Sequence, residues 1–110
     1  TYQLAPAYDL MNTTLHIEGD DLGLNGGLSE YLEKSNVYDR TGHPCRLDFE
    51  RFGETIGLRK KRISSILDAF SVLPSEVEAL VESSYLNEKL KRTYLRIVKE
   101  RLIRFNRLLE

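Results

Sequence analysis

The chain has 110 residues, of which 41% are hydrophobic and 30% are charged, and its formal net charge is −1. This length allows one small domain with a modest core, and no apolar run approaches the roughly 18 residues that a membrane-spanning helix needs. The chain begins without a secretory signal pattern. Its one cysteine, Cys45, excludes an intrachain disulfide, which fits a reducing, cytoplasmic location.

The first predicted element is an extended segment that leads to an acid. Tyr2-Gln3 is typical of the end of a short strand, and the ring of Pro6 favours extended geometry in the residue before it. Asp9 follows among apolar neighbours, where a charge needs a partner. That partner could be a helix that begins at Leu10, a basic side chain or a bound cation. A chain that starts inside a strand also indicates a fragment of a longer protein.

Residues 12–46 are expected to be irregular. Two short strands are possible there, at Leu15-His16-Ile17 and Leu22-Gly23-Leu24, with a turn between them. Asn25-Gly26-Gly27 predicts a plain turn, because it lacks the spacing and the Lys-Ser/Thr pair of a phosphate-binding loop. Residues 35–36 and 40–44 are typical of loops.

Four side chains are candidate ligands of a structural metal ion: His16, Asp39, His43 and Cys45. Only His43 and Cys45 are close in sequence, and no second pair has zinc-type spacing. The pattern therefore favours His16 as a surface or strand histidine and Cys45 as a small buried apolar group.

Residues 47–110 have helical periodicity and are predicted to hold four helices. On the first, the apolar side chains are spaced three and four apart: Phe49, Phe52 and Ile56. Asp48 is its expected N-cap and Gly57 its stop. The second is expected from Lys60 to Leu73, with an apolar face of Ile63, Ile66, Leu67 and Phe70. Pro74 ends it, and Ser75 with Glu78 predicts a capping box for the third helix.

The fourth predicted helix is long, and Asn87 is its expected N-cap. Its apolar stripe is regular: Leu95, Val98, Leu102, Phe105 and Leu109. Its other face is basic: Lys89, Arg92, Arg96, Lys99 and Arg107. Residues 88–110 hold eight basic and three acidic groups, against four and ten in residues 1–58. Such a stripe needs a partner surface, from the other helices or from a missing part of a parent protein.

Three stretches resemble HipA-type serine/threonine kinases, the toxins of HipAB toxin–antitoxin pairs. They are Tyr2 to Thr13 with its Pro-Ala-Tyr-Asp-Leu run, Phe52 to Ile63, and Pro74 to Tyr94 with its Ser-Tyr-Leu-Asn-Glu run. The resemblance covers most of the chain in order. It implies a mainly α fold, the four-helix bundle-like C-terminal part of a kinase C-lobe. Residues 1–46 would be a β/loop segment that carries the metal-binding aspartate, and residues 47–110 the helical region.

The resemblance also implies an activity, phosphoryl transfer from ATP to a protein hydroxyl, in which Asp9 binds Mg²⁺ and thereby the nucleotide. The family's nucleotide-binding loop, phosphate-contacting lysine, catalytic base and second metal ligand lie upstream. We therefore expect no catalytic residue in this fragment and no activity from it alone. Where the family commonly has a lysine after the glycine turn, this chain has Leu28.

The implied partners follow from the same resemblance. They are the upstream part of the kinase, a helix-turn-helix antitoxin of the HipB type and a protein substrate from the translation machinery, such as an aminoacyl-tRNA synthetase. DNA would be contacted only through the antitoxin, and no membrane contact is expected.

An alternative interpretation is a DNA-binding helix-turn-helix over residues 49–70. Gly53, Gly57 and Ile63 have the small–glycine–aliphatic spacing that lets two helices cross closely. The basic residues Arg59, Lys60, Lys61 and Arg62 would then meet phosphates or base edges. The second helix lacks the Gln, Asn and Arg cluster that base recognition needs beyond its first turn. A purely scaffolding role beneath a catalytic cleft is also compatible with the kinase interpretation.

Overall fold

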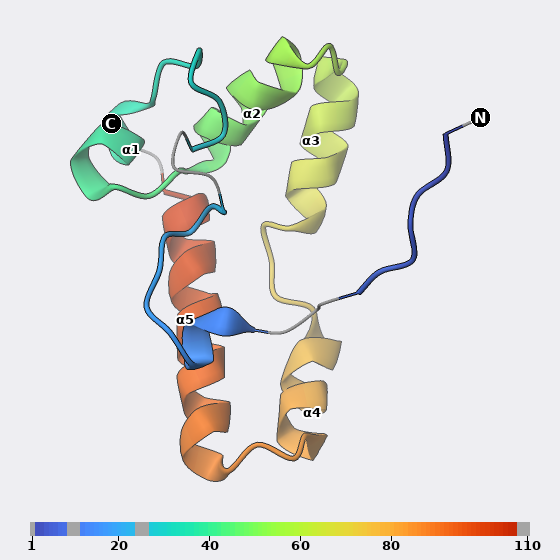
Figure 1. The fold of residues 1–110 in the computed structure, drawn as a ribbon, viewed down its shortest axis with the longest axis vertical. Coiled ribbons are helices and arrows are strands. Elements are labelled where there is room, and N and C mark those ends of the chain that lie inside the picture. The colour runs from blue at the N-terminus through green and yellow to red at the C-terminus, as the bar shows by residue number, and fades with distance from the viewer. Residues whose placement is uncertain (1, 9–11, 24–26, 108–110) are drawn as a thin grey trace.

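The structure, a computed structural model, describes residues 2–8, 12–23 and 27–107. They contain a 3-10 helix, η1 (Thr13–Leu15), and five α-helices: α1 (Asn36–Thr41), α2 (Arg46–Thr55), α3 (Lys60–Ala69), α4 (Ser75–Ser83) and α5 (Glu88–Phe105). No β-strand occurs in these three ranges. The fold is therefore mainly α, as predicted, and α5 runs along the molecule from α4 to the vicinity of α1 (Figure 1).

The predicted strand at Leu15-His16-Ile17 is wrong. The side chain of Asn12 accepts a hydrogen bond from the Leu15 amide at 3.3 Å, and the amides of His16 and Ile17 both donate to the Thr13 carbonyl at 2.9 Å. An asparagine offers a local acceptor that competes with strand pairing, and here it favours a helical turn. The second predicted strand is also absent at Leu22 and Gly23, which form a bend, while Leu24 lies outside the described residues.

Helix α1 lies where the sequence predicted a loop. The hydroxyl of Ser35 accepts from the Tyr38 amide at 3.1 Å and caps its start, and Gly42, with φ of 72°, ends it. Val37 is buried. Six residues carry too little periodicity to distinguish a helix from a loop.

Helices α2 and α3 form the closely crossed pair that the glycine spacing predicted. Gly53 is buried against Ile63, and a Cβ atom on Gly53 would meet Ile63 Cγ1 at 2.8 Å. Gly57 forms the turn with φ of 83°, and the Leu58 amide donates to the Gly53 carbonyl at 2.9 Å. Helix α3 ends at Ala69 rather than at Leu73.

Helices α4 and α5 form a hairpin (Figure 1). As predicted, Asn87 caps α5 by accepting from the Leu90 amide at 3.0 Å. The predicted capping box at Ser75 is wrong, because Pro74 is the N-cap of α4 and no side chain caps that helix. The carboxylate of Glu78 instead pairs with Lys99 of α5 at 2.7 Å.

Contacts at the other end of α5 join it to α2 and to the segment that precedes α4. The rings of Phe105 and Phe49 have centroids 5.7 Å apart, and Asn106 donates to the Ser71 carbonyl at 2.8 Å. The loop around Asp21 runs beside α5, and its carboxylate lies 3.6 Å from Arg101 and 2.6 Å from His43 (Figure 1).

The core of this arrangement is thin. Among the described residues, five apolar side chains are buried: Val37, Pro44, Cys45, Ile63 and Val81. The Cα radius of gyration is 15.8 Å, whereas a compact domain of this length has about 13 Å. Much apolar surface therefore stays uncovered. Within the described ranges, no helix is both long and apolar enough to cross a bilayer.

Candidate functional site

Asp9, the predicted ligand of Mg²⁺ and contact of the nucleotide, lies outside the described residues, as does Leu10. The segment that leads to Asp9, residues 2–8, is extended and points away from the helices (Figure 1). The exposed fractions of Tyr2, Leu4 and Tyr8 are 107%, 96% and 73%. None of the hydrogen bonds between described residues involves residues 2–8. This segment therefore presents bare backbone and apolar side chains.

The candidate metal ligands do not converge. His43 Nδ1 lies 2.6 Å from Asp21 Oδ2, and the buried Cys45 lies with its Sγ 3.6 Å from the Ser35 hydroxyl. His16 is exposed after η1, and Asp39 is exposed on α1. In the part of the chain that the structure describes, no group of three or more His, Cys, Asp or Glu side chains could hold a metal ion.

Asp48, predicted as the N-cap of α2, is instead a buried residue of its first turn, and Cys45 is the N-cap. Its carboxylate accepts from the Cys45 amide at 2.9 Å and from the amide and hydroxyl of Ser35, both at 2.7 Å. Burial raises the pKa of Asp48, but these hydrogen bonds outweigh burial and hold the pKa below its usual value. Asp48 thus links the starts of α1 and α2, and its role is structural.

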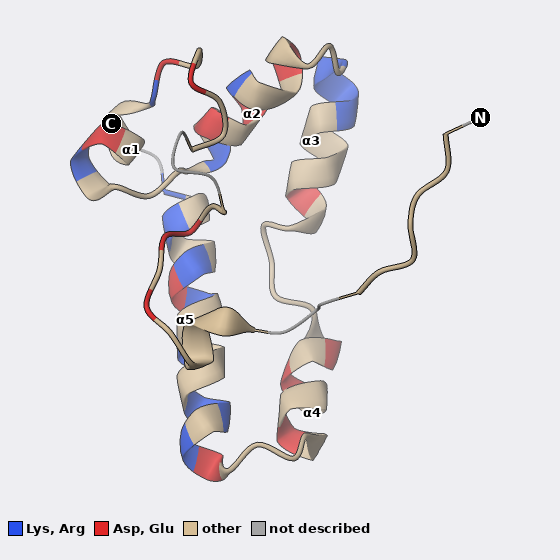
Figure 2. Ribbon diagram, viewed as in Figure 1, with Lys and Arg blue, Asp and Glu red and all other residues tan. Residues whose placement is uncertain are grey.

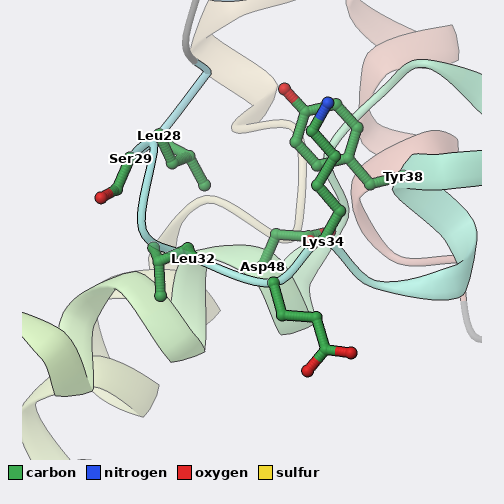
Figure 3. Close-up of a pocket in the computed structure, with 7 residues that line it drawn as sticks. Leu28, Ser29, Leu32, Lys34, Tyr38 and Asp48 are labelled. Carbon is green, nitrogen blue, oxygen red and sulfur yellow. The ribbon is translucent and has the colours of Figure 1, made fainter.

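A small cavity lies beside this carboxylate and is shown in Figure 3. Its volume is about 10 Å³, and Leu28, Leu32 and Tyr38 are among the residues that line it. Lys34 Nζ lies 4.7 Å from the centroid of the Tyr38 ring. A cavity of this size holds about one water molecule, so it is not a substrate site.

At the predicted glycine turn, the backbone of Gly27 lies close to the side chain of Tyr38. Asn25 and Gly26 lie outside the described residues, while Gly27 has φ of 72°. A Cβ atom on Gly27 would lie 2.7 Å from the Tyr38 hydroxyl oxygen. The positive φ of Gly27, which other residues rarely adopt, favours glycine at this position, and the close approach of the Tyr38 hydroxyl adds to that preference.

The start of α3 carries concentrated positive charge (Figure 2). The four basic residues of this cluster, hereafter the basic helix start, are all exposed: Arg59, Lys60, Lys61 and Arg62. The first turn of α3 has no acidic residue, and its N-cap makes no side-chain hydrogen bond. These charges add to the positive end of the helix dipole. Lys60 has one carboxylate nearby, that of Glu54 at 3.5 Å.

An apolar groove lies between α2 and α3. Its volume is about 200 Å³, and it is lined by Phe49, Phe52, Gly53, Ile56, Leu58, Ile63, Ile66 and Leu67. The exposed fractions of Ile56 and Leu58 are 56% and 38%. The sequence predicted most of these residues as the inner faces of two helices, and periodicity alone does not tell whether such a face is covered.

Comparisons of this chain with protein-family models, with curated proteins and with solved structures found no match. The fold and its described surfaces define a mainly helical protein with a thin core, a basic helix start and an uncovered apolar groove.

Proposed function

We propose that this chain is the C-terminal helical part of a HipA-like serine/threonine kinase of the cytoplasm. The proposal rests on the resemblance of its three stretches to that family, and one structural observation supports it most. Residues 2–8 are extended, apolar and exposed, with no hydrogen-bonded partner among the described residues. Unpaired backbone groups and exposed apolar side chains are usually buried against another protein segment. The upstream part of a kinase would supply such a segment.

In this proposal Asp9 is the contribution of the chain to the active site. A carboxylate is a suitable ligand of Mg²⁺, which neutralises the phosphate oxygens during phosphoryl transfer. Pro6 restricts the backbone shortly before Asp9 and so limits where its carboxylate lies. The other metal ligand, the catalytic base and the nucleotide-binding loop belong to the upstream part, so the chain alone is inactive.

The partners of the complete kinase would be a helix-turn-helix antitoxin of the HipB type and a protein substrate, with DNA contacted only through the antitoxin. The test is phosphate transfer from ATP, in the presence of Mg²⁺, by the longer parent polypeptide and by this chain alone. We expect transfer by the parent and none by the chain. A parent that transfers no phosphate to any protein, itself included, contradicts the proposal.

A second candidate function is DNA binding by α2 and α3. Two observations favour it, the close crossing at Gly53 and Ile63 and the exposure of the whole basic helix start. Beyond the first turn, however, the exposed polar residues of α3 are Ser64, Ser65 and Asp68, and the carboxylate of Asp68 pairs with Arg46 at 2.7 Å. No cation or amide side chain therefore follows the first turn to read base edges. DNA binding predicts an affinity for duplex DNA that falls steeply with salt and falls further when the basic residues become glutamine. No such affinity at low salt contradicts this second candidate.

A further inference from the structure

The apolar groove and the basic helix start are parts of one continuous surface. Leu58 and Ile63 both line the groove, and the four basic residues are the segment between them. A partner that fills the groove therefore meets positive charge at one end of it. The groove itself carries no charged lining residue.

The geometry of α3 divides the basic residues into two sets. Successive helical residues are rotated by about 100°, so Lys60 lies within about 60° of the direction of Ile63, and Arg59 is the N-cap just before it. Lys61 points about 160° away from Ile63 by the same rule. Lys60 thus lies on the groove side of α3, and Arg59 directly follows Leu58, which lines the groove. Lys61 lies on the opposite side of the helix.

The first turn of α3 has no acidic residue of its own to stabilise the helix start, and the carboxylate of Glu54 lies 3.5 Å from Lys60 Nζ. The first intrahelical bonds are those of the Arg62 and Ile63 amides to the Arg59 carbonyl, at 2.8 and 3.0 Å. The earlier amides of a helix have no partner within it. A carboxylate from outside would meet these amides, the helix dipole and two cations together.

We propose that the groove between α2 and α3 binds an amphipathic helix of a partner protein, with apolar anchors in the groove and acidic residues against Arg59 and Lys60. A helix presents such anchors at i, i+3 or i+4, and i+7. The phosphate backbone of DNA would satisfy the cations but has no aliphatic side chain to fill a groove of about 200 Å³. The inference is independent of the kinase proposal, because it uses neither Asp9 nor residues 2–8.

The probe is a synthetic helical peptide of about 16 residues, long enough to form a helix, with leucine anchors on one face and glutamates beside them. Its counterpart has lysines in place of the glutamates. Each carries a fluorescent label, and its anisotropy is followed as this chain is added at several salt concentrations. We expect the glutamate peptide to bind at least about tenfold more tightly than the lysine peptide at low salt.

Two variants and two matched controls locate the binding surface. Ile56→Glu places a charge in the groove and should weaken binding about tenfold or more. Ile103→Glu, which alters a more exposed isoleucine on α5, should not. Lys60→Gln should weaken binding by about twofold to fivefold and reduce its salt dependence, whereas Lys61→Gln should leave both unchanged. Circular dichroism confirms that each variant is folded.

Three results would overturn the proposal. The first is equal binding of both peptides, and the second is unchanged binding by Ile56→Glu. The third is binding of a short DNA duplex in preference to the glutamate peptide, with equal losses for Lys60→Gln and Lys61→Gln, which would make the surface a nucleic-acid site. None of these results bears on phosphate transfer by the parent, so this proposal and the kinase proposal can fail separately.

Discussion

The carboxylate of Asp48 accepts two hydrogen bonds of 2.7 Å from Ser35, one from its amide and one from its hydroxyl. The same hydroxyl accepts from the Tyr38 amide at the start of α1, and the carboxylate also accepts from the Cys45 amide at the start of α2. One buried acid thus fixes how two helices begin. In a protein with so few buried apolar side chains, we expect this polar contact to matter for stability.

Asp48→Asn should lower the free energy of unfolding by about 1–3 kcal/mol, because the amide is neutral and its nitrogen cannot accept a hydrogen bond from Ser35 or Cys45. Urea denaturation followed by circular dichroism measures this change. Asp39→Asn is the control, since Asp39 is an exposed residue of α1, and it should change stability by less than about 0.5 kcal/mol. Equal effects of the two substitutions would show that the contact with Ser35 contributes no net stability.

The same contact predicts a pH dependence. The pKa of Asp48 is lower in the folded chain than its usual value of 3.8. Its contribution is therefore fully present above the unfolded pKa and is lost as the pH falls through the folded pKa. The difference in unfolding free energy between the native chain and Asp48→Asn should shrink from about pH 6 to about pH 2. A difference that stays constant over this range would contradict the assigned pKa direction.

Gly53→Ala should destabilise the protein by about 1–2 kcal/mol. The new Cβ atom would lie 2.8 Å from Ile63 Cγ1 and 2.9 Å from its Cδ1, and this overpacking exceeds the helix propensity gained with alanine. Thermal unfolding of Gly53→Ala, with Gly19→Ala as a control that has open space around it, measures the effect. Adding Ile63→Val removes Cδ1 and should recover part of the loss. A gain in stability from Gly53→Ala alone would mean that α2 and α3 do not cross this closely.

The elements that sequence predicted best are those whose signals are local. The side chain of Asn87 caps α5 by accepting from the amide of Leu90, three residues later, and Gly57 has a positive φ just after the end of α2. The cap at Asn87 and the turn at Gly57 each depend on a few adjacent residues and on the conformational preference of one residue type. The capping box at Ser75 failed because α4 begins one residue earlier than expected, with Pro74 at its N-cap, while Glu78 pairs with Lys99, which is distant in sequence.

The features that sequence did not predict depend on contacts between distant segments. Nothing in the periodicity of Ile56 and Leu58 distinguishes a covered apolar face from an open groove, since both give the same pattern. Asp48 was assigned to the N-cap because its bonds to Ser35, thirteen residues earlier, leave no sequence pattern. The role of Asp9 comes from resemblance alone and stays a prediction.

The most direct measurement of the central claim is phosphate transfer from Mg-ATP by the longer parent polypeptide, native against Asp9→Asn. The substitution keeps the size of the side chain and removes the charge that would hold Mg²⁺. Asp20→Asn is the control, an exposed acid of the loop that precedes α1. The account predicts that transfer is lost in Asp9→Asn, with folding intact, and is retained in Asp20→Asn. Unchanged transfer by a folded Asp9→Asn parent would contradict it and remove Asp9 from the active site.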